Sequence, residues 1–182
     1  MDKVYVAFDI KERGDKPPVG HQLIGVHMIF DIKMENFQFK ARLVANGNET
    51  GTPASLTYAS VVSRESVRIA LTIAALNGLE VKTSDIENAY LTAPTEEKLY
   101  TILGSEFGKD KGKIGVIVRA LYGTKSAGAS FRNHLADCML HLGYESCKAD
   151  PDVWLKQFTK SDGRKYYGYI LLYVDDALCI NH

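Results

Sequence analysis

The sequence lacks the features that mark several large classes of protein. It has three cysteines, Cys138, Cys147 and Cys179, and no CxxC pair, which excludes a disulfide framework and favours a reducing, intracellular setting. Its longest strictly apolar run, Tyr169–Val174, is far shorter than the roughly 20 residues of a membrane-spanning helix. The first residues contain no apolar core and no small-residue cleavage site, so we expect no secretory signal.

Neither sign of charge is in excess, because 22 Lys and Arg residues balance 22 Asp and Glu residues. The net charge therefore gives no general attraction to nucleic acid or to acidic partners. Locally the balance shifts: residues 85–106 carry five acids and one base, whereas 109–132 carry six bases and one acid. The basic stretch would suit a nucleic-acid backbone, or it is ordinary solvated surface. With 182 residues, 46% of them hydrophobic, the chain is long enough for one domain with its own core.

Hydrophobic patterning predicts strands and helices in mixed order, which indicates an α+β fold. Two strand-like runs, 22–31 and 37–44, flank a polar stretch and predict a β-hairpin. Residues 63–76 carry apolar side chains at helical spacing, with Ser63 as a cap and Asn77-Gly78 as a stop. Further strands are predicted at 79–84, 114–119, 165–173 and 177–180, and a second helix at 130–142.

Two adjacent carboxylates, Asp175 and Asp176, interrupt the most apolar part of the sequence, YILLYVDDALCI. Adjacent carboxylates repel each other and resist desolvation, so something must compensate. Either a turn leaves both in water, or a bound divalent cation supplies positive charge. The two explanations are compatible, because the tip of a tight hairpin would present both carboxylates to a metal ion.

A third carboxylate, Asp85, follows the strand predicted at 79–84, where it either caps the next turn or faces a cleft. Together with Asp175 and Asp176 it forms a set of oxygen ligands suited to Mg²⁺ or Mn²⁺. Two such ions could clamp the attacking and leaving oxygens of a phosphoryl transfer. Lys40 and Arg42, two residues apart on one strand face, could grip a triphosphate or belong to an exposed face.

Six segments, in order along nearly the whole chain, resemble the reverse transcriptase of copia-type LTR retrotransposons. They are FKARLVANG at 39–47, YASVV at 58–62, DIENAYL at 85–91, RALYGTK at 119–125, ADP at 149–151 and LLYVDD at 171–176. Each segment alone is a weak signal, and the resemblance rests on their shared order and spacing. The chain departs from the family at 124–128, where TKSAG replaces the usual LKQSP, and at Asn46, where a lysine is usual.

The resemblance implies the fingers and palm of a right-hand polymerase, with a ferredoxin-like palm sheet that has helices on one face. We expect one reverse transcriptase domain over 1–182, with fingers roughly at 20–84 and 91–125 and palm roughly at 85–90 and 126–182. The thumb is expected to be absent, because the chain ends shortly after the YVDD segment. On this interpretation the chain is a fragment of a retroelement polyprotein.

The resemblance also implies a set of site residues. Asp85, Asp175 and Asp176 would be the catalytic carboxylates and would hold two Mg²⁺ ions, with Mn²⁺ as a possible substitute. Tyr90 would be the steric gate under the sugar, and Tyr173 would lie near the primer terminus. The nucleotide-binding residues implied are Lys40, Arg42, Ile86, Ala89, Tyr90, Tyr122 and Gly123.

The implied activity is RNA-directed DNA polymerisation, a two-metal nucleotidyl transfer to a primer 3′-hydroxyl. The implied partners are an RNA or DNA template with its primer, dNTPs, and the rest of the polyprotein, including thumb, RNase H and integrase, without a membrane. The implied location is the cytoplasm, in a virus-like particle, or the nucleus. Two alternatives stay open: an inactive remnant that binds nucleic acid weakly, and another two-metal phosphoryl-transfer enzyme on a similar palm.

Overall fold

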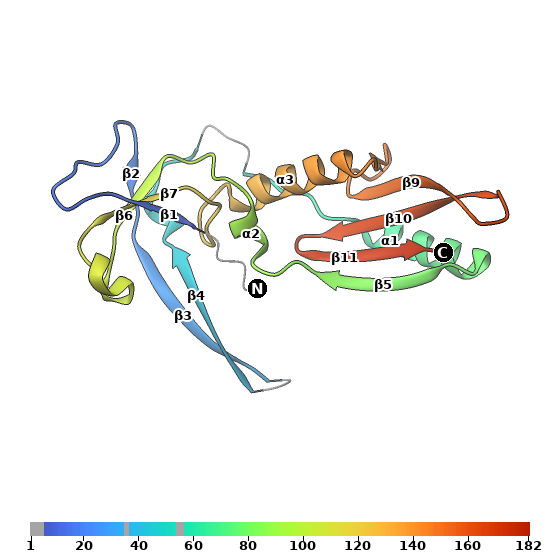
Figure 1. Cartoon of the computed structure of the whole chain (residues 1–182), viewed down its shortest axis with the longest axis horizontal. Helices are drawn as coiled ribbons and strands as arrows, with labels where there is room; N and C mark the ends of the chain where they lie inside the picture. Colours follow the sequence, from blue (N-terminus) through green and yellow to red (C-terminus); the bar gives the residue numbers. More distant parts are fainter. Residues whose placement is uncertain (1–5, 35–36, 54–56) are drawn as a thin grey trace. The chain divides into compact units, whose positions relative to one another are not determined.

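The computed structural model describes residues 6–34, 37–53 and 57–182 (Figure 1). The chain forms two compact units. The first comprises Met1–Tyr58 and Tyr90–Phe131, and the second comprises Ala59–Ala89 and Arg132–His182. Residues 59–84, which the resemblance assigns to the fingers, therefore lie in the same unit as the YVDD segment.

The first unit contains a four-stranded sheet in the order β1-β7-β6-β2. Its strands are β1 (Phe8–Ile10), β2 (Gln22–Leu23), β6 (Leu99–Ile102) and β7 (Ile114–Ile117). β2 runs parallel to β6, and the other pairs are antiparallel. The core beside this sheet contains Ile24, Ala45, Leu99, Ile117 and Leu121. The described part of this unit also contains short helical segments: η1 (Gly47–Glu49), α2 (Ala89–Thr92), which begins at the boundary residue, and η2 (Ser105–Asp110).

The predicted hairpin is present as the antiparallel pair β3 (Val26–Lys33) and β4 (Gln38–Ala45). Its first strand begins later than predicted, because the run from residue 22 is split at Ile24 and Gly25. Ile24 is fully buried in the core, and the backbone N–H of Gly25 donates to the Glu49 carboxylate at 2.8 Å. Residues 22 and 23 instead form β2 and pair with β6, so the prediction of one continuous strand over 22–31 is wrong. Residues 35–36 of the predicted polar turn lie outside the described part of the chain.

The second unit contains a five-stranded antiparallel sheet in the order β5-β11-β10-β9-β8. Its strands are β5 (Glu80–Asp85), β8 (Glu145–Ser146), β9 (Val153–Thr159), β10 (Lys165–Tyr173) and β11 (Asp176–Asn181). The predictions of strands at 79–84, 165–173 and 177–180 are therefore confirmed. Of the predicted catalytic carboxylates, Asp85 ends β5, Asp176 begins β11, and Asp175 lies in the turn between β10 and β11.

The first predicted helix is confirmed as α1 (Arg64–Asn77), and its ends follow from its sequence. The Ser63 hydroxyl caps it by accepting the backbone N–H of Ser66 at 3.1 Å. Gly78 ends it in the left-handed conformation, with φ at 62°, that glycine adopts without strain. The second predicted helix is confirmed as α3 (Ala127–His141), which begins three residues earlier than the sequence pattern indicated. Among the described residues, no helix combines the length and apolar character needed to cross a membrane.

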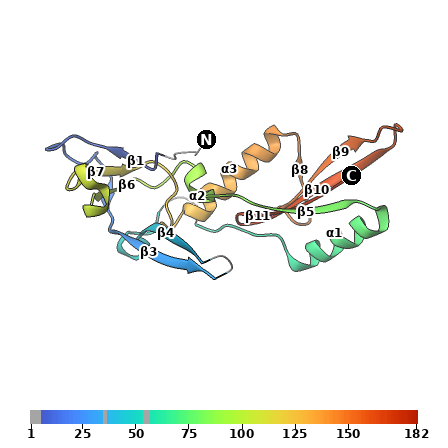
Figure 2. The ribbon, with the colours of Figure 1, turned by 60° about the horizontal axis from the view of Figure 1, so that its bottom comes forward.

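The two long helices pack on opposite faces of the five-stranded sheet (Figure 2). Leu171 packs with Ala70 and Ala74 of α1, whereas its neighbour Leu172 packs with Met139 of α3. Successive side chains of a strand point to opposite faces, so the two helices must cover different faces. The prediction of helices on one face is therefore wrong for α1 and α3, because β10 is apolar on both of its faces.

Candidate active site

The site residues predicted from the sequence fall into two groups, one in each unit. The three carboxylates belong to the second unit, together with Ile86, Ala89 and Tyr173. Tyr90, Tyr122 and Gly123 belong to the first unit, together with Lys40 and Arg42. The two groups are described in turn, each within its own unit.

Two of the three carboxylates, Asp175 and Asp176, lie on a hairpin whose backbone is strained. β10 and β11 are joined by the two-residue turn Val174-Asp175, and Tyr173 pairs with Asp176 across it. Val174 has φ at 55°, a left-handed conformation that β-branched residues rarely adopt. A two-residue hairpin with positive φ at its first turn position normally carries glycine there. Valine at this position costs about 1–3 kcal/mol, and backbone strain of this kind clusters at functional sites.

We expect Val174→Gly to stabilise the second unit by about 1 kcal/mol, because glycine adopts positive φ without the steric cost of a branched side chain. Urea-induced unfolding would measure the change. Val174→Ala is the matched control, since alanine still carries a Cβ at positive φ and should stabilise less than glycine. A glycine variant less stable than the wild type would contradict the strain assigned to this turn.

Backbone pairing brings the third carboxylate next to the hairpin. Asp85, the last residue of β5, pairs directly with Asp176 at the start of β11. The backbone N–H of Ile86 donates to the carbonyl oxygen of Asp175 at 2.9 Å. Asp85 and Asp176 are exposed and Asp175 is half-buried. Like charges directly opposite each other destabilise a sheet. The pairing of Asp85 with Asp176 therefore lowers the stability of the folded protein, and folding alone does not explain why both residues are acidic.

The chemistry of these three side chains fits a hard divalent cation. All three offer carboxylate oxygens, and none forms an ion pair with another described residue. As they stand, no three His, Cys, Asp or Glu side chains of the described residues gather closely enough to hold a metal ion. Bare carboxylates repel each other, so a closer arrangement of the three needs the charge of the ion itself.

The second group is an aromatic cluster in the first unit. The ring of Tyr90, in α2, lies 4.7 Å from the ring of Tyr122 between centroids and 5.9 Å from that of Phe131. Gly123 has φ at 90°, and a Cβ there would collide with the carbonyl oxygen of Ala45. The residue at 123 must therefore be glycine. This close approach anchors the Tyr122-Gly123 turn on the end of β4, where the N–H of Ala45 donates to the Tyr122 carbonyl at 2.7 Å.

The two predicted triphosphate-binding cations lie on that same strand. Lys40 and Arg42 are two residues apart on β4, so their side chains share one face of the ribbon, as predicted. Arg42 is exposed and Lys40 is half-buried. Neither forms an ion pair with a described residue, although Lys40 stands opposite Asp31 on β3.

Sequence reasoning missed a buried ionic network beside the hairpin. Asp152 is 3% exposed, accepts from the Arg132 side chain at 3.0 Å and accepts from the Ser60 hydroxyl. Its backbone carbonyl accepts the N–H of Leu172 at 2.9 Å, two residues before the turn. The nearest signal in the sequence was the ADP segment at 149–151, which the resemblance identified without a role for Asp150 and without including Asp152.

Asp150 completes this network at the start of α1. It accepts hydrogen bonds from the Ser66 hydroxyl at 2.6 Å and from the Ser63 backbone N–H at 2.9 Å. Burial raises the pKa of the Asp150 carboxyl, but these hydrogen bonds outweigh burial and leave the pKa below its ordinary value. The ionised carboxylate thus fixes the amino end of α1, where negative charge is favourable.

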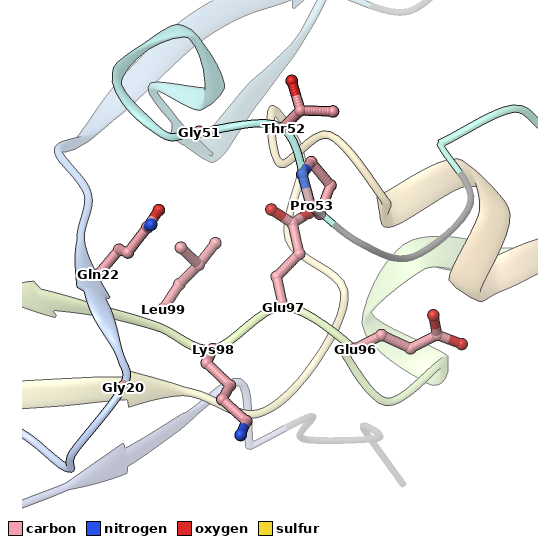
Figure 3. Close-up of a pocket in the computed structure, with 9 residues that line it drawn as sticks. All are labelled: Gly20, Gln22, Gly51, Thr52, Pro53, Glu96, Glu97, Lys98 and Leu99. Atoms are coloured by element: carbon pink, nitrogen blue, oxygen red, sulfur yellow. The ribbon is translucent and has the colours of Figure 1, made fainter.

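A separate pocket of about 340 Å³ lies in the first unit, beside the segment that departs from the family (Figure 3). Glu97 lines it and is 8% exposed. One of its carboxylate oxygens accepts from both the backbone N–H and the hydroxyl of Ser126, each at 2.7 Å. Lys125 donates to the carbonyl of Thr50. These contacts give Lys125 and Ser126 a structural role in holding the turn that leads into α3.

Comparison with known proteins identifies the family. Residues 13–182 match the family described as reverse transcriptase (RNA-dependent DNA polymerase), and the chain belongs to that family. It is 29% identical over 171 residues to the retrovirus-related Pol polyprotein from transposon TNT 1-94 of Nicotiana tabacum, which covers 90% of this chain and 13% of that protein. It is also 29% identical over 171 residues to the corresponding polyprotein from transposon RE1 of Arabidopsis thaliana, covering 89% and 11%.

These matches confirm the resemblance to copia-type retrotransposon reverse transcriptases. The chain spans roughly an eighth of the length of the first of these relatives, at 13%, and slightly less of the second, at 11%. No solved structure matches the chain.

Proposed function

We propose that this chain supplies the fingers and palm of an RNA-directed DNA polymerase, which transfers nucleotides to a primer 3′-hydroxyl with the help of two divalent cations. The observation that carries the proposal is the direct pairing of Asp85 with Asp176 beside the strained turn that contains Asp175. The fold tolerates both a repulsive carboxylate pair and a strained valine at one point, which is the pattern of a site selected for function.

In this proposal the carboxylate oxygens of the three aspartates would hold the ions. Two Mg²⁺ ions held there would supply positive charge that favours loss of the 3′-hydroxyl proton and offsets the negative charge at the α-phosphorus. Tyr173 is 56% exposed beside Asp176 and would contact the primer terminus. The backbone of Ile86 and Ala89, which follow Asp85, would border the incoming nucleotide.

The first unit would bind the nucleotide's other parts. Lys40 and Arg42 would pair with the triphosphate, since cations hold phosphate oxygens through charge-assisted hydrogen bonds. The Tyr122-Gly123 turn would line the nucleotide pocket. The ring of Tyr90, held against Tyr122 and Phe131, would lie under the sugar and exclude a 2′-hydroxyl.

We expect Tyr90→Ala to raise the incorporation of ribonucleotides relative to deoxyribonucleotides by about 10-fold or more, because a steric contact of this size discriminates at that level. The ratio of kcat/KM for the two substrates measures the effect. Tyr90→Phe keeps the ring and should keep the discrimination. Unchanged sugar selection in Tyr90→Ala would contradict the steric role.

The proposed partners follow from the activity: an RNA or DNA template with its primer, dNTPs, and the other parts of a Pol polyprotein, in a cytoplasmic particle or in the nucleus. Primer extension on poly(rA)/oligo(dT) with Mg²⁺ or Mn²⁺ tests the proposal. Extension that requires metal supports it. Folded protein that fails to extend would favour a catalytically inactive remnant, and hydrolysis of nucleic acid without nucleotides would favour a different phosphoryl-transfer enzyme.

A further inference from the structure

The hairpin of β3 and β4 has one apolar face and one charged face. Residues directly opposite each other on antiparallel strands share a face, so the register of the hairpin assigns each side chain to one of the two. Alternate pairs are apolar on both strands and form what we call the apolar face: Val26 with Ala45, Met28 with Leu43, Phe30 with Ala41, and Ile32 with Phe39. The charged residues of the two strands all lie on the opposite face: Asp31, Lys33, Lys40 and Arg42.

The inner end of the apolar face belongs to the core of the first unit, and its outer end is uncovered. Val26 and Ala45 pack in that core. Further along the strands, Phe30 is 76% exposed, Ile32 is 45% exposed and Phe39 is 85% exposed. The two strands pack mainly against each other, and Figure 1 shows the hairpin projecting from the rest of its unit. The apolar face therefore continues from the core into solvent.

An uncovered face of this kind indicates a missing partner. A two-stranded hairpin is marginally stable unless its hydrophobic face packs against something. Met34 and Phe37, at the outer end of the same hairpin, are also mostly exposed. Together with Phe30, Ile32 and Phe39 they leave about 700 Å² of apolar surface uncovered. Contiguous apolar patches larger than a few hundred Å² mark interaction sites.

A second copy of the chain fits this surface in both area and charge. Two copies related by a twofold axis would bury the patch twice, about 1,400 Å² in all, which lies within the range of about 1,200–2,000 Å² for stable interfaces. A twofold contact also brings each residue close to the same surface of its partner, so a charged face would repel itself. None of the four pairs on the apolar face contains a charged residue, so this repulsion does not arise.

We propose that two copies of this chain associate through the apolar faces of their β3–β4 hairpins, with Phe30, Ile32 and Phe39 at the centre of the contact. Two ribbons stacked about 10 Å apart would form a small β-sandwich. Lys40 and Arg42 lie on the opposite face, so the contact does not cover them. The dimer is therefore compatible with the proposed nucleotide-binding role of these cations and does not depend on it.

The hairpin contains a matched pair of residues for the test. Ile32 lies on the apolar face and is 45% exposed, whereas Ile29 lies on the opposite face of the same strand and is 43% exposed. Sedimentation velocity of the wild type between about 1 and 100 µM should show a dimer that higher concentration favours. Ile32→Ser should raise the dissociation constant about 10-fold or more, because each dimer loses two buried isoleucines, whereas Ile29→Ser should change it less than about 2-fold.

Phe39→Ser gives a second measurement at the most exposed of the three central side chains, where folding should not be affected, and it should also weaken the dimer about 10-fold or more. Circular dichroism must show each variant folded. The wild-type dimer should persist in about 1 M NaCl, since salt screens charges but does not weaken apolar contacts.

A wild type that is monomeric over the whole concentration range would overturn the proposal. Equal effects of Ile32→Ser and Ile29→Ser would overturn the assignment of the contact to the apolar face, and so would a dimer that Phe39→Ser leaves unchanged. Oligomers that keep growing beyond the dimer would also contradict it, because a twofold contact closes on itself.

Discussion

Asp85→Asn is expected to lower primer extension by about 10³-fold or more while the protein becomes slightly more stable. The loss follows because metal-assisted charge stabilisation is worth several kcal/mol, and each 1.4 kcal/mol is a factor of ten in rate. The stability should rise by about 0.2–1 kcal/mol, because the substitution removes the repulsion between Asp85 and Asp176 on adjacent strands. Steady-state extension and urea unfolding on the same preparations measure the two effects.

Glu87→Gln is the matched control for this prediction, since Glu87 is an exposed acid two residues further along the chain. It makes the same change in charge without touching the paired carboxylates, so extension should stay near the wild-type rate. Asp85→Asn with wild-type extension would contradict the role of Asp85. A loss of extension accompanied by a loss of stability would attribute the effect to folding instead.

Asp152→Ala is expected to destabilise the second unit by about 3 kcal/mol. Removing one partner of a buried ion pair leaves the other charge without compensation, at a cost of about 3–5 kcal/mol. The low end applies here, because the Arg132 side chain is still 30% exposed, whereas that of Asp152 is 5% exposed. The midpoint of urea unfolding measures the loss.

The double variant Asp152→Ala/Arg132→Met separates the ion pair from simple loss of packing. It removes both charges, so it should recover part of the stability lost in Asp152→Ala. A double variant as unstable as the single one would contradict an electrostatic role for the pair. The network matters for function because the carbonyl of Asp152 also holds the backbone of Leu172, two residues before the strained turn.

The parts of this fold that local sequence controls were predictable. The hairpin at Tyr173–Asp176 follows from two apolar runs around two polar residues, and α1 follows from Ser63, its apolar spacing and Gly78. In α1 the capping residues and the hydrophobic period agree, so tertiary packing had nothing to override. In the hairpin the turn lies one residue earlier than the predicted Asp175-Asp176 pair, at Val174-Asp175, and the strained valine there was not predicted.

Other parts depend on contacts between distant segments. No local pattern indicates that Asp85 pairs with Asp176, since about 90 residues separate them and only the sheet order β5-β11-β10 brings them together. The apolar run that starts at residue 22 likewise divides at Ile24, because Ile24 is buried in the core and residues 22 and 23 pair with β6. The opposite placement of α1 and α3 could have been read from β10, whose residues 170, 171 and 172 are all apolar and must fill two faces.

Side-chain parity left the exposure of Asp85 undecided, and the structure explains why. By side-chain alternation, Leu79 and Asp85 lie on the same face of the strand. Leu79 packs against α1, whereas Asp85 lies beyond the part of the strand that α1 covers and is exposed. The buried Asp152 network could not be predicted either, because its partners Ser60, Arg132 and Leu172 come from three separate segments of the chain.

We propose that the aspartates of the hairpin and of β5 form a metal-dependent polymerase site. Primer extension on poly(rA)/oligo(dT) by the wild type and by Asp175→Asn, side by side, with Mg²⁺ and with EDTA, tests this proposal. We expect extension by the wild type that EDTA abolishes and that Asp175→Asn lacks, with both proteins equally folded. Extension by Asp175→Asn at the wild-type rate would contradict it.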